Sequence, residues 1–259
     1  SPASTFGGCH FFDSVHVSAY SLSGHDTPKS FTDPQDGLPG RLLRNHTAHQ
    51  TNTRALVKMQ FSVGLAIAVA KSIKADQFLH VQQMLGELLG YIEQVKSALV
   101  RSEYESELSD VGTIRPSLAP LQAIRTMLPT AYPRVIEVLQ TIGAGGFMLM
   151  PSGADFRAPE LSDDLALYYQ GAGGMPSVDR VRLFKLAWDL AGEAFGQRLV
   201  QYERYYAGDP VRNLAMNYLS NQSPDMQRLV DNALALAGQP EVGKDITASS
   251  VKELEPALD

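Results

Sequence analysis

The stretch that indicates the fold most directly is "VQQMLGELLGYIEQVKSAL", Val81 to Leu99. Its large apolar residues alternate spacings of four and three. They are Val81, Leu85, Leu88, Ile92, Val95 and Leu99. Such spacings fall on one face of an α-helix, the face that packs in a helix bundle, and Glu87, Gln94, Lys96 and Glu103 lie outside it. The stretch therefore predicts a bundle helix.

Two neighbouring regions carry the same helical signal. Asn52 to Ser72 is apolar almost all round, so we expect that helix to be buried on several sides. Pro116 to Ile142 is a third helical region, in which Pro129 and Pro133 are expected to split or kink the helix. From about Arg41 onward the sequence predicts helices throughout.

The C-terminal half predicts further helices. A short one is expected at Ser162 to Tyr169, and a long one from an N-cap at Ser177 to about Tyr205. The seam of the long helix is Val181, Phe184, Trp188, Ala191, Phe195, Leu199 and Tyr202. Ser223 and Pro224 open a final helix that Gly238 closes, and the tail beyond is polar.

The first forty residues differ from this pattern. "CHFFDSVHVSAY", Cys9 to Tyr20, alternates and is rich in aromatic and β-branched residues, which indicates one or two strands followed by a turn-rich loop. A sheet rarely stands on one strand pair, so we expect these residues to belong to a β-domain that the chain does not supply in full. The fold class is mainly α. The expected domains are 1–40, a helical bundle at 41–220, and a C-terminal helix with a polar tail at 221–259.

Composition restricts the partners. The chain has 259 residues, of which 44% are hydrophobic and 19% charged, as in globular proteins. A net charge of -6 gives no reason to expect a nucleic-acid partner. Lys58 and Gln60 interrupt the richest apolar run, Ala55 to Ala70, which falls short of a membrane span, and the N-terminus lacks signal-peptide features. With one cysteine, we expect a soluble cytoplasmic protein.

No metal site or catalytic residue emerges from the residues themselves. His46 and His49 are three apart, but no carboxylate joins them at ligand spacing, and structural roles are favoured. Cys9 has no basic neighbours that would lower its pKa, which argues against a nucleophile. The catalytic residues therefore stay unassigned.

Two stretches could hold a ligand. "LQTIGAGGFMLMPSGAD", Leu139 to Asp155, has a glycine cluster that would let a phosphate approach the backbone, although a helix C-cap and loop is the favoured alternative. In "QYERYYAGDPVRN", Gln201 to Asn213, Gly208 suits a helix C-cap, and Asp209 and Pro210 suit the start of the next helix. Such a helix N-terminus beside Arg212 can bind a pyrophosphate or a carbonyl edge. On these grounds alone, a plain helix corner is favoured.

The order of the segments resembles a known family. "TRALVKMQFSVGLAIAVA", "VQQMLGELLGYIEQVKSAL" and "LQTIGAGGF" resemble the C-terminal helical domain of the acyl-CoA dehydrogenase fold. "FFDSVHV", "YPRVIEVLQTIGAGGFMLMPSGADF" and "RVRLFKLAWDLAGEAFGQRLVQYERYYAGDPVRN" are similar to the 4-hydroxyphenylacetate 3-hydroxylase family. Members of that family are the oxygenase components of two-component, flavin-dependent phenol hydroxylases.

The resemblance implies a cofactor, partners and site residues. A separate flavin reductase delivers reduced FAD, and the oxygenase uses dioxygen to hydroxylate a phenolic substrate at the ortho carbon. The first cofactor-binding candidates are Ala207, Gly208, Asp209, Pro210, Val211 and Arg212. Weaker candidates are Gly143, Gly145 and Gly146. The likeness also implies homotetramers built through the helical domain.

The chain departs from the family at its N-terminal side. Nothing matches the N-terminal helical domain or most of the β-barrel, so residues 1–40 are interpreted as the terminal strand and loop of a barrel otherwise absent. "SIKADQFLH", Ser72 to His80, also lacks the basic residue that many acyl-CoA dehydrogenases carry there. Two alternatives stay open. One is a non-catalytic helical oligomerisation or binding module. The other is an acyl-CoA dehydrogenase-type oxidoreductase, which the stretch "YERYYAGDPVRN" disfavours.

Overall fold

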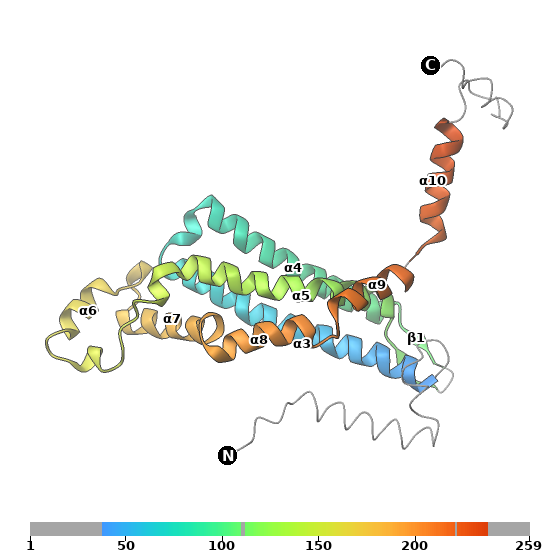
Figure 1. Cartoon of the computed structure of the whole chain (residues 1–259). Helices are drawn as coiled ribbons and strands as arrows, with labels where there is room; N and C mark the ends of the chain where they lie inside the picture. The colour runs from blue at the N-terminus through green and yellow to red at the C-terminus, as the bar shows by residue number, and fades with distance from the viewer. Residues whose placement is uncertain (1–37, 110–111, 221, 238–259) are drawn as a thin grey trace. The chain divides into compact units, whose positions relative to one another are not determined.

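The computed structural model describes residues 38–109, 112–220 and 222–237, and within these ranges the protein is almost entirely helical (Figure 1). One small antiparallel sheet pairs β1 (Glu107–Leu108) with β2 (Ile114–Arg115). The mainly α prediction is therefore confirmed. The strands expected near the N-terminus lie outside the described residues. Contacts divide the chain into two units, residues 1–217 and 218–259.

The core of the first unit is built by three long helices that lie side by side (Figure 1). They are α3 (Leu38–Ser72), α4 (Leu79–Tyr104) and α5 (Leu118–Gly143), and each contacts the other two. A short 3-10 turn, η2 (Ala75–Gln77), joins α3 to α4. Every residue of the predicted α4 seam is buried, because that face meets both neighbours. Helix α3 begins before Arg41, and it accommodates Pro39 because the first turn needs no intrahelical N–H bond.

Helix α5 is continuous, so of the two expected effects of the prolines, a split or a kink, the split does not occur. Pro129 and Pro133 both lie inside the helix, and Pro129 is buried. Each proline removes one backbone hydrogen bond at a cost of roughly 3 kcal/mol. Burial of a long apolar face against α3 and α4 outweighs that cost, since Leu121, Val135 and Leu139 are completely buried.

The long helix expected from Ser177 to Tyr205 is in fact two helices, which correct that prediction. Helix α7 (Ser177–Ala191) ends at Gly192, and α8 (Ala194–Tyr205) follows. Trp188 explains the break: its indole N–H donates to Glu193 (2.9 Å), and its ring covers Gly192, where a Cβ would lie 2.3 Å from the ring. The N-cap of α7 is Pro176 and not Ser177.

The break also changes which residues are buried. Val181, Phe184 and Ala191 of the predicted seam are buried in α7, but Phe195 is 68% exposed and Tyr202 37% exposed on α8. A single periodic seam requires one uninterrupted helix. Because the helix breaks at Gly192, the residues of α8 no longer continue the buried face of α7. Helices α7 and α8 nevertheless pack against α5 and thereby complete the bundle.

Shorter elements connect these helices. After α5 come η3 (Ala144–Phe147), η4 (Asp155–Arg157), α6 (Ser162–Tyr168) and η5 (Ala172–Gly174). Helix α6 confirms the short helix expected there. Helix α9 (Pro210–Ser220) follows α8. In the second unit, α10 (Pro224–Ala237) begins as predicted, with the Ser223 hydroxyl accepting a bond from the Asp225 amide (3.2 Å).

One described helix is long and apolar enough to cross a membrane by length and composition, the stretch Arg44–Ser72 of α3. Half of its most apolar window is buried inside the protein, as in a core helix. The sequence had suggested that this segment falls short of a span, because Lys58 and Gln60 interrupt the shorter run considered there.

The helix break predicts unequal effects for two glycine substitutions. Gly192→Ala should lower the free energy of unfolding by roughly 1–3 kcal/mol, because its Cβ would overlap the Trp188 ring. Gly86→Ala on α4 is the matched control: nothing lies within 4 Å of its Cβ, and alanine favours a helix. Urea denaturation should find the control unchanged or stabilised. Equal destabilisation of both variants would contradict this account of the break.

Candidate functional site

The corner between α8 and α9 has the local structure that its sequence predicts. Gly208 has a φ of 99°, a left-handed conformation that favours glycine, and Pro210 is the first residue of α9. The Asp209 carboxylate caps the helix by accepting bonds from the amides of Val211 (3.2 Å) and Arg212 (3.3 Å). Gly208, Asp209, Val211 and Arg212 are exposed, so this corner faces outward.

The cap limits what the corner can bind. Two amides that a free helix N-terminus would offer to an anion already bond the Asp209 carboxylate. A phosphate therefore finds no free pair of amides at Val211 and Arg212. The Arg212 side chain remains: it is exposed, and no acidic residue of the described part is paired with it. Its guanidinium is the main donor that the corner presents outward.

The corner is held from behind by α5. Arg125 donates to the Ala207 carbonyl, and Gln122 donates to the carbonyl of Asn213 (3.3 Å). The buried Asn213 amide donates to the carbonyls of Ala207 (3.1 Å) and Gly208 (3.4 Å). These bonds fix the backbone on both sides of Gly208. Sequence reasoning did not assign Gln122 or Arg125, whose signal would have been polar residues within the buried face of an apolar helix.

Arg125 makes the rear of the corner electropositive. Burial, together with the nearby Arg44, lowers the pKa of its guanidinium. Among the described residues no carboxylate forms an ion pair with Arg125; its hydrogen bond goes to a neutral carbonyl. The corner thus combines one partly buried cation behind the backbone with the exposed Arg212 in front.

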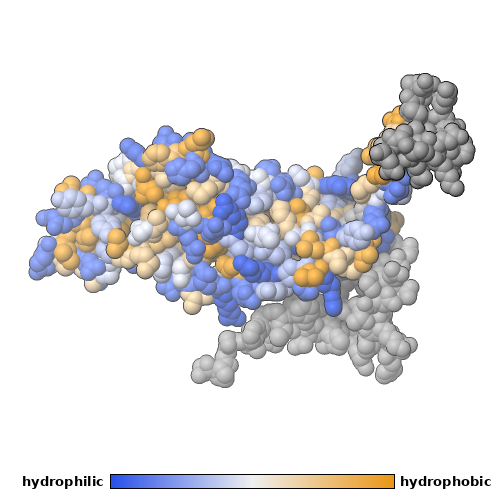
Figure 2. All heavy atoms as spheres, turned by 45° about the horizontal axis from the view of Figure 1, so that its top comes forward, coloured by the Kyte–Doolittle hydropathy of each residue, from blue (hydrophilic) through white to orange (hydrophobic). Residues whose placement is uncertain are grey.

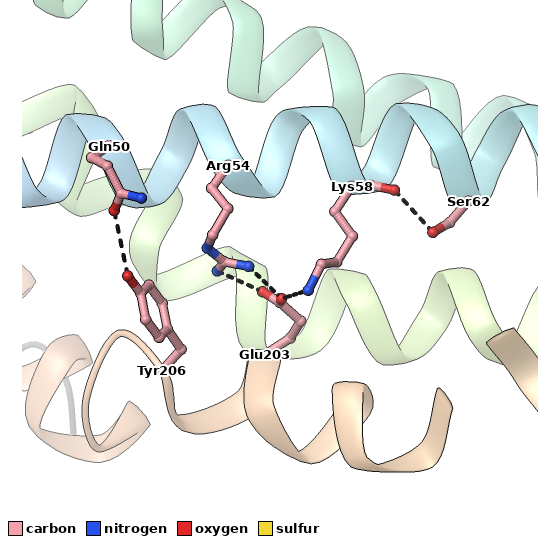
Figure 3. A network of polar contacts seen from close by, with 6 residues as sticks. All are labelled: Gln50, Arg54, Lys58, Ser62, Glu203 and Tyr206. Atoms are coloured by element: carbon pink, nitrogen blue, oxygen red, sulfur yellow. Dashed lines mark hydrogen bonds and ion pairs between the residues drawn. The ribbon is translucent and has the colours of Figure 1, made fainter. Parts of the chain in front are cut away.

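A buried carboxylate fastens α8 to α3 one turn before the corner (Figure 3). Glu203 is 4% exposed, and it accepts two hydrogen bonds from Arg54 (2.6 and 2.9 Å) and one from Lys58 (2.5 Å). Burial alone would raise the pKa of Glu203, but the bonds and charges of Arg54 and Lys58 outweigh burial and hold that pKa below its usual value. The carboxylate is therefore ionised at neutral pH.

Tyrosine rings enclose the two cations. The Arg54 guanidinium carbon lies 4.3 Å from the ring centre of Tyr206 and 5.3 Å from that of Tyr202. Lys58 Nζ lies 5.7 Å from the ring centre of the buried Tyr132, whose pKa burial raises to about 12. Tyr206 also contacts Gln50 through its hydroxyl (3.4 Å; Figure 3). Two cations share one carboxylate, and the rings compensate part of the remaining positive charge.

The glycine turn after α5 is explained mainly by packing. A Cβ on Gly143 would lie 2.2 Å from the Phe147 ring, and a Cβ on Gly146 would lie 2.8 Å from the Phe184 ring. Gly145 is open on that side, with nothing within 4 Å of its Cβ position. Gly143 is also 18 positions beyond Arg125 on the continuous helix α5, a distance of about 27 Å. The structure therefore does not bring the turn and the corner together within one chain.

Of the histidine pair, His49 makes a structural contact, and His46 is exposed. His49 Nε2 lies 2.8 Å from a Glu103 carboxylate oxygen and so links α3 to α4. Within residues 38–109, 112–220 and 222–237, no group of three or more His, Cys, Asp or Glu could hold a metal ion. Cys9 lies outside these ranges.

Comparisons with known proteins show which family the chain resembles. The family model HpaB, described as "4-hydroxyphenylacetate 3-hydroxylase C terminal", matches residues 41–235. A Bacillus subtilis relative, "Probable 4-hydroxyphenylacetate 3-monooxygenase", is 36% identical over 188 residues, which are 73% of this chain and 38% of the relative. The chain therefore spans well under half the length of the curated relative.

Two solved structures share the fold. One is the oxygenase component (HpaB) of 4-hydroxyphenylacetate 3-monooxygenase complexed with FAD and 4-hydroxyphenylacetate: identity is 34%, the TM-score 0.70, and the match covers 74% of this chain and 40% of that chain. The other is an archaeal 4-hydroxybutyryl-CoA dehydratase from N. maritimus, with 18% identity, a TM-score of 0.64, and coverage of 82% and 43%. The second likeness shows the fold alone.

The buried ion pair predicts a pH-dependent loss of stability. Glu203→Gln should lower the free energy of unfolding at pH 7 by about 3 kcal/mol, because it leaves Arg54 and Lys58 without their carboxylate. Since the folded-state pKa of Glu203 lies below its ordinary value of 4.5, wild type keeps this contribution above about pH 4.5 and loses it as the pH falls through the folded-state pKa. Denaturant titrations at pH 7 and at decreasing acidic pH should show the difference between variant and wild type shrinking.

The exposed pair Arg101–Glu105 supplies the control for this measurement. Its atoms are 2.8 Å apart, but both side chains are exposed, so Glu105→Gln should change stability little at either pH. If Glu203→Gln behaved like Glu105→Gln, the ion pair could not be what fastens α8 to α3.

Proposed function

We propose that this chain forms the helical part of the oxygenase component of a flavin-dependent phenol hydroxylase. The reason is that the chain belongs to the family of 4-hydroxyphenylacetate 3-hydroxylase C-terminal domains. The single observation that carries this proposal is the family match over residues 41–235, which contains the bundle, the glycine turn and the corner. The solved relative complexed with FAD and 4-hydroxyphenylacetate supports the choice of cofactor and of a phenolic substrate class.

In the proposed reaction, one atom of dioxygen enters the ring ortho to the phenol hydroxyl and the other leaves as water. A separate reductase supplies FAD in its reduced form. The cofactor, when bound, supplies the oxygen chemistry; the protein binds it, orients it and excludes water. We assign this chain the binding and orienting part of that work and no proton transfer, because none of its described residues is identified as an acid or base of the reaction.

The corner is the proposed flavin contact of this chain. Gly208, Asp209, Val211 and Arg212 are exposed, whereas Ala207 is buried behind them, and the outward Arg212 guanidinium suits a phosphate or a ring carbonyl of a flavin. The cap formed by Asp209 argues for contact through the Arg212 side chain and not through the helix amides. Gly143 ends α5, and Gly145 and Gly146 follow in η3, far from the corner, so within one chain these glycines are proposed as a separate, weaker contact.

The proposal includes further parts of the protein. Because the chain spans 38% of its Bacillus subtilis relative, the phenol pocket and most of the flavin pocket are assigned to N-terminal and β-barrel parts beyond the matched region. We therefore expect the 259-residue chain alone, given reduced FAD, oxygen and a simple phenol, to form no hydroxylated product. Product analysis by chromatography tests this, and clear turnover by the pure chain would contradict it.

Self-association through this domain is also proposed, in the form of a tetramer in the cytoplasm. Hydrophobic residues reach the visible surface in several patches (Figure 2). On α3, Val57 is 61% and Phe61 53% exposed, and on α4 Val100 is 64% exposed. Exposed apolar patches of this kind are typical of interfaces. Light scattering across a dilution series should give a mass well above 28.2 kDa, and a stable monomer would oppose the proposal.

The alternatives make different predictions. A non-catalytic oligomerisation module would assemble but would not bind reduced flavin when the missing parts are supplied. An acyl-CoA dehydrogenase-type enzyme would act on a thioester, and the likeness to a CoA-dependent dehydratase supports the shared fold only. Titration with reduced FAD, with and without a protein that supplies the N-terminal parts, distinguishes the first of these from a hydroxylase.

Two substitutions at the corner separate structure from binding. Gly208→Ala should lower the melting temperature of the flavin-free protein and also flavin affinity, because a Cβ at a φ of 99° costs roughly 1–2 kcal/mol. Arg212→Ala should leave that melting temperature almost unchanged but weaken reduced-FAD binding by roughly ten- to a hundredfold through loss of a charge-assisted bond. Both are measured in the assembly that contains the N-terminal parts. Unchanged flavin affinity of Arg212→Ala would remove this residue from the site.

A further inference from the structure

A pocket lies at the other end of the bundle from the corner. It has a volume of about 170 Å³ and lies between the glycine turn, α6 and the first turns of α7. Among the residues that line it are Gly146, Met150, Tyr168, Tyr169, Arg180 and Phe184. An apolar cavity of about 150 Å³ is known to hold one benzene molecule, so this volume suits a single six-membered ring.

The pocket contains a cation held by aromatic rings and not by an acid. The Arg180 guanidinium carbon lies 5.4 Å from the ring centre of Phe184 and 5.8 Å from that of Tyr169. The guanidinium donates a hydrogen bond to the neutral carbonyl of Gln170 (3.3 Å). In the described ranges no carboxylate is paired with Arg180, whereas Arg182, two residues further along α7, lies 3.8 Å from Asp179.

The walls around this cation are preorganised. Phe184 is 3% exposed and packs edge-on against Phe147, with 5.5 Å between ring centres. The Tyr169 hydroxyl donates to the Leu149 carbonyl (2.5 Å) and so fixes that ring. Gly146 lets the Phe184 ring pack directly against the backbone, because a Cβ there would lie 2.8 Å from that ring. A ligand would therefore meet fixed rings at Phe184 and Tyr169 and lose little affinity to their reorganisation, whereas Tyr168, which is 74% exposed, would close over it from outside.

We infer that this pocket binds a small aromatic carboxylate, with its single ring against Tyr168, Tyr169 and Phe184 and its carboxylate on Arg180. A guanidinium is suited to both tasks, since its planar fork pairs with carboxylates and its face stacks on aromatic rings. The volume disfavours a nucleotide, whose base and ribose together need more room. The site does not depend on the proposed flavin corner, which is joined to α5 about 27 Å away from the glycine turn.

The binding test needs only the 259-residue chain and three probes. Phenylacetate, titrated by calorimetry, should bind saturably with one site per chain and an affinity in the roughly millimolar range typical of so small a ligand. Phenylacetamide, its neutral match, should bind about tenfold more weakly because it cannot form a charge-assisted pair with Arg180. Absence of saturable phenylacetate binding overturns the inference. Tighter binding of adenosine monophosphate than of phenylacetate also overturns it and identifies a nucleotide site.

Two arginine variants locate the binding. Arg180→Gln should weaken phenylacetate binding about tenfold and abolish the preference over phenylacetamide. Arg182→Gln on the same helix is the matched control and should leave both affinities unchanged, because Arg182 is exposed and does not line the pocket. Should Arg180→Gln fail to fold, Arg180→Lys keeps the charge and loses the fork, and an intermediate affinity is expected. Wild-type affinity in either Arg180 variant, or equal losses in Arg180→Gln and Arg182→Gln, would refute the assignment.

Discussion

The position of the α8–α9 corner depends on one buried carboxylate. Glu203 lies one turn before Ala207, and its ion pairs with Arg54 and Lys58 join α8 to the central helix α3. A carboxylate that is 4% exposed is unfavourable unless it is paired, so α8 has a strong preference for the register in which both cations reach Glu203. With α8 in this register, Arg125 and Asn213 reach the Ala207 carbonyl and fix the backbone of the corner.

The bundle supplies the rigid frame that this ion pair requires. Helix α5 remains continuous through two prolines because it is packed between α3, α4 and α8, and it is the helix that carries Gln122 and Arg125 to the back of the corner. At the opposite end of α5, the Phe147 ring of η3 packs against Gly143, and the Phe184 ring of α7 packs against Gly146. Helix α5 thus supports the proposed flavin contact directly and ends at the glycine turn that leads into the pocket around Arg180.

The two proposed binding regions differ in their electrostatics. At the corner, Asp209 satisfies the helix amides, and positive charge comes from Arg212 in front and Arg125 behind. In the pocket around Arg180, this arginine has no paired carboxylate among the described residues, and its guanidinium lies on aromatic faces. The first suits the polar edge of a large cofactor, and the second suits a small ring with one negative charge.

The sequence by itself determined the features that are encoded locally: the buried seam of α4, the short helix α6, the cap at Ser223, and the Gly208–Asp209–Pro210 corner. Periodicity and capping depend on residues within one or two turns, so they can be recognised without the fold. Only the tertiary structure decided the continuity of α5 and the partners of the corner, whereas the break at Gly192 comes from contacts within five residues that periodicity alone did not reveal. Glu203 meets Arg54 across 149 positions, and Arg125 meets Ala207 across 82. Contacts at such separations are created when helices pack, and no local pattern specifies them.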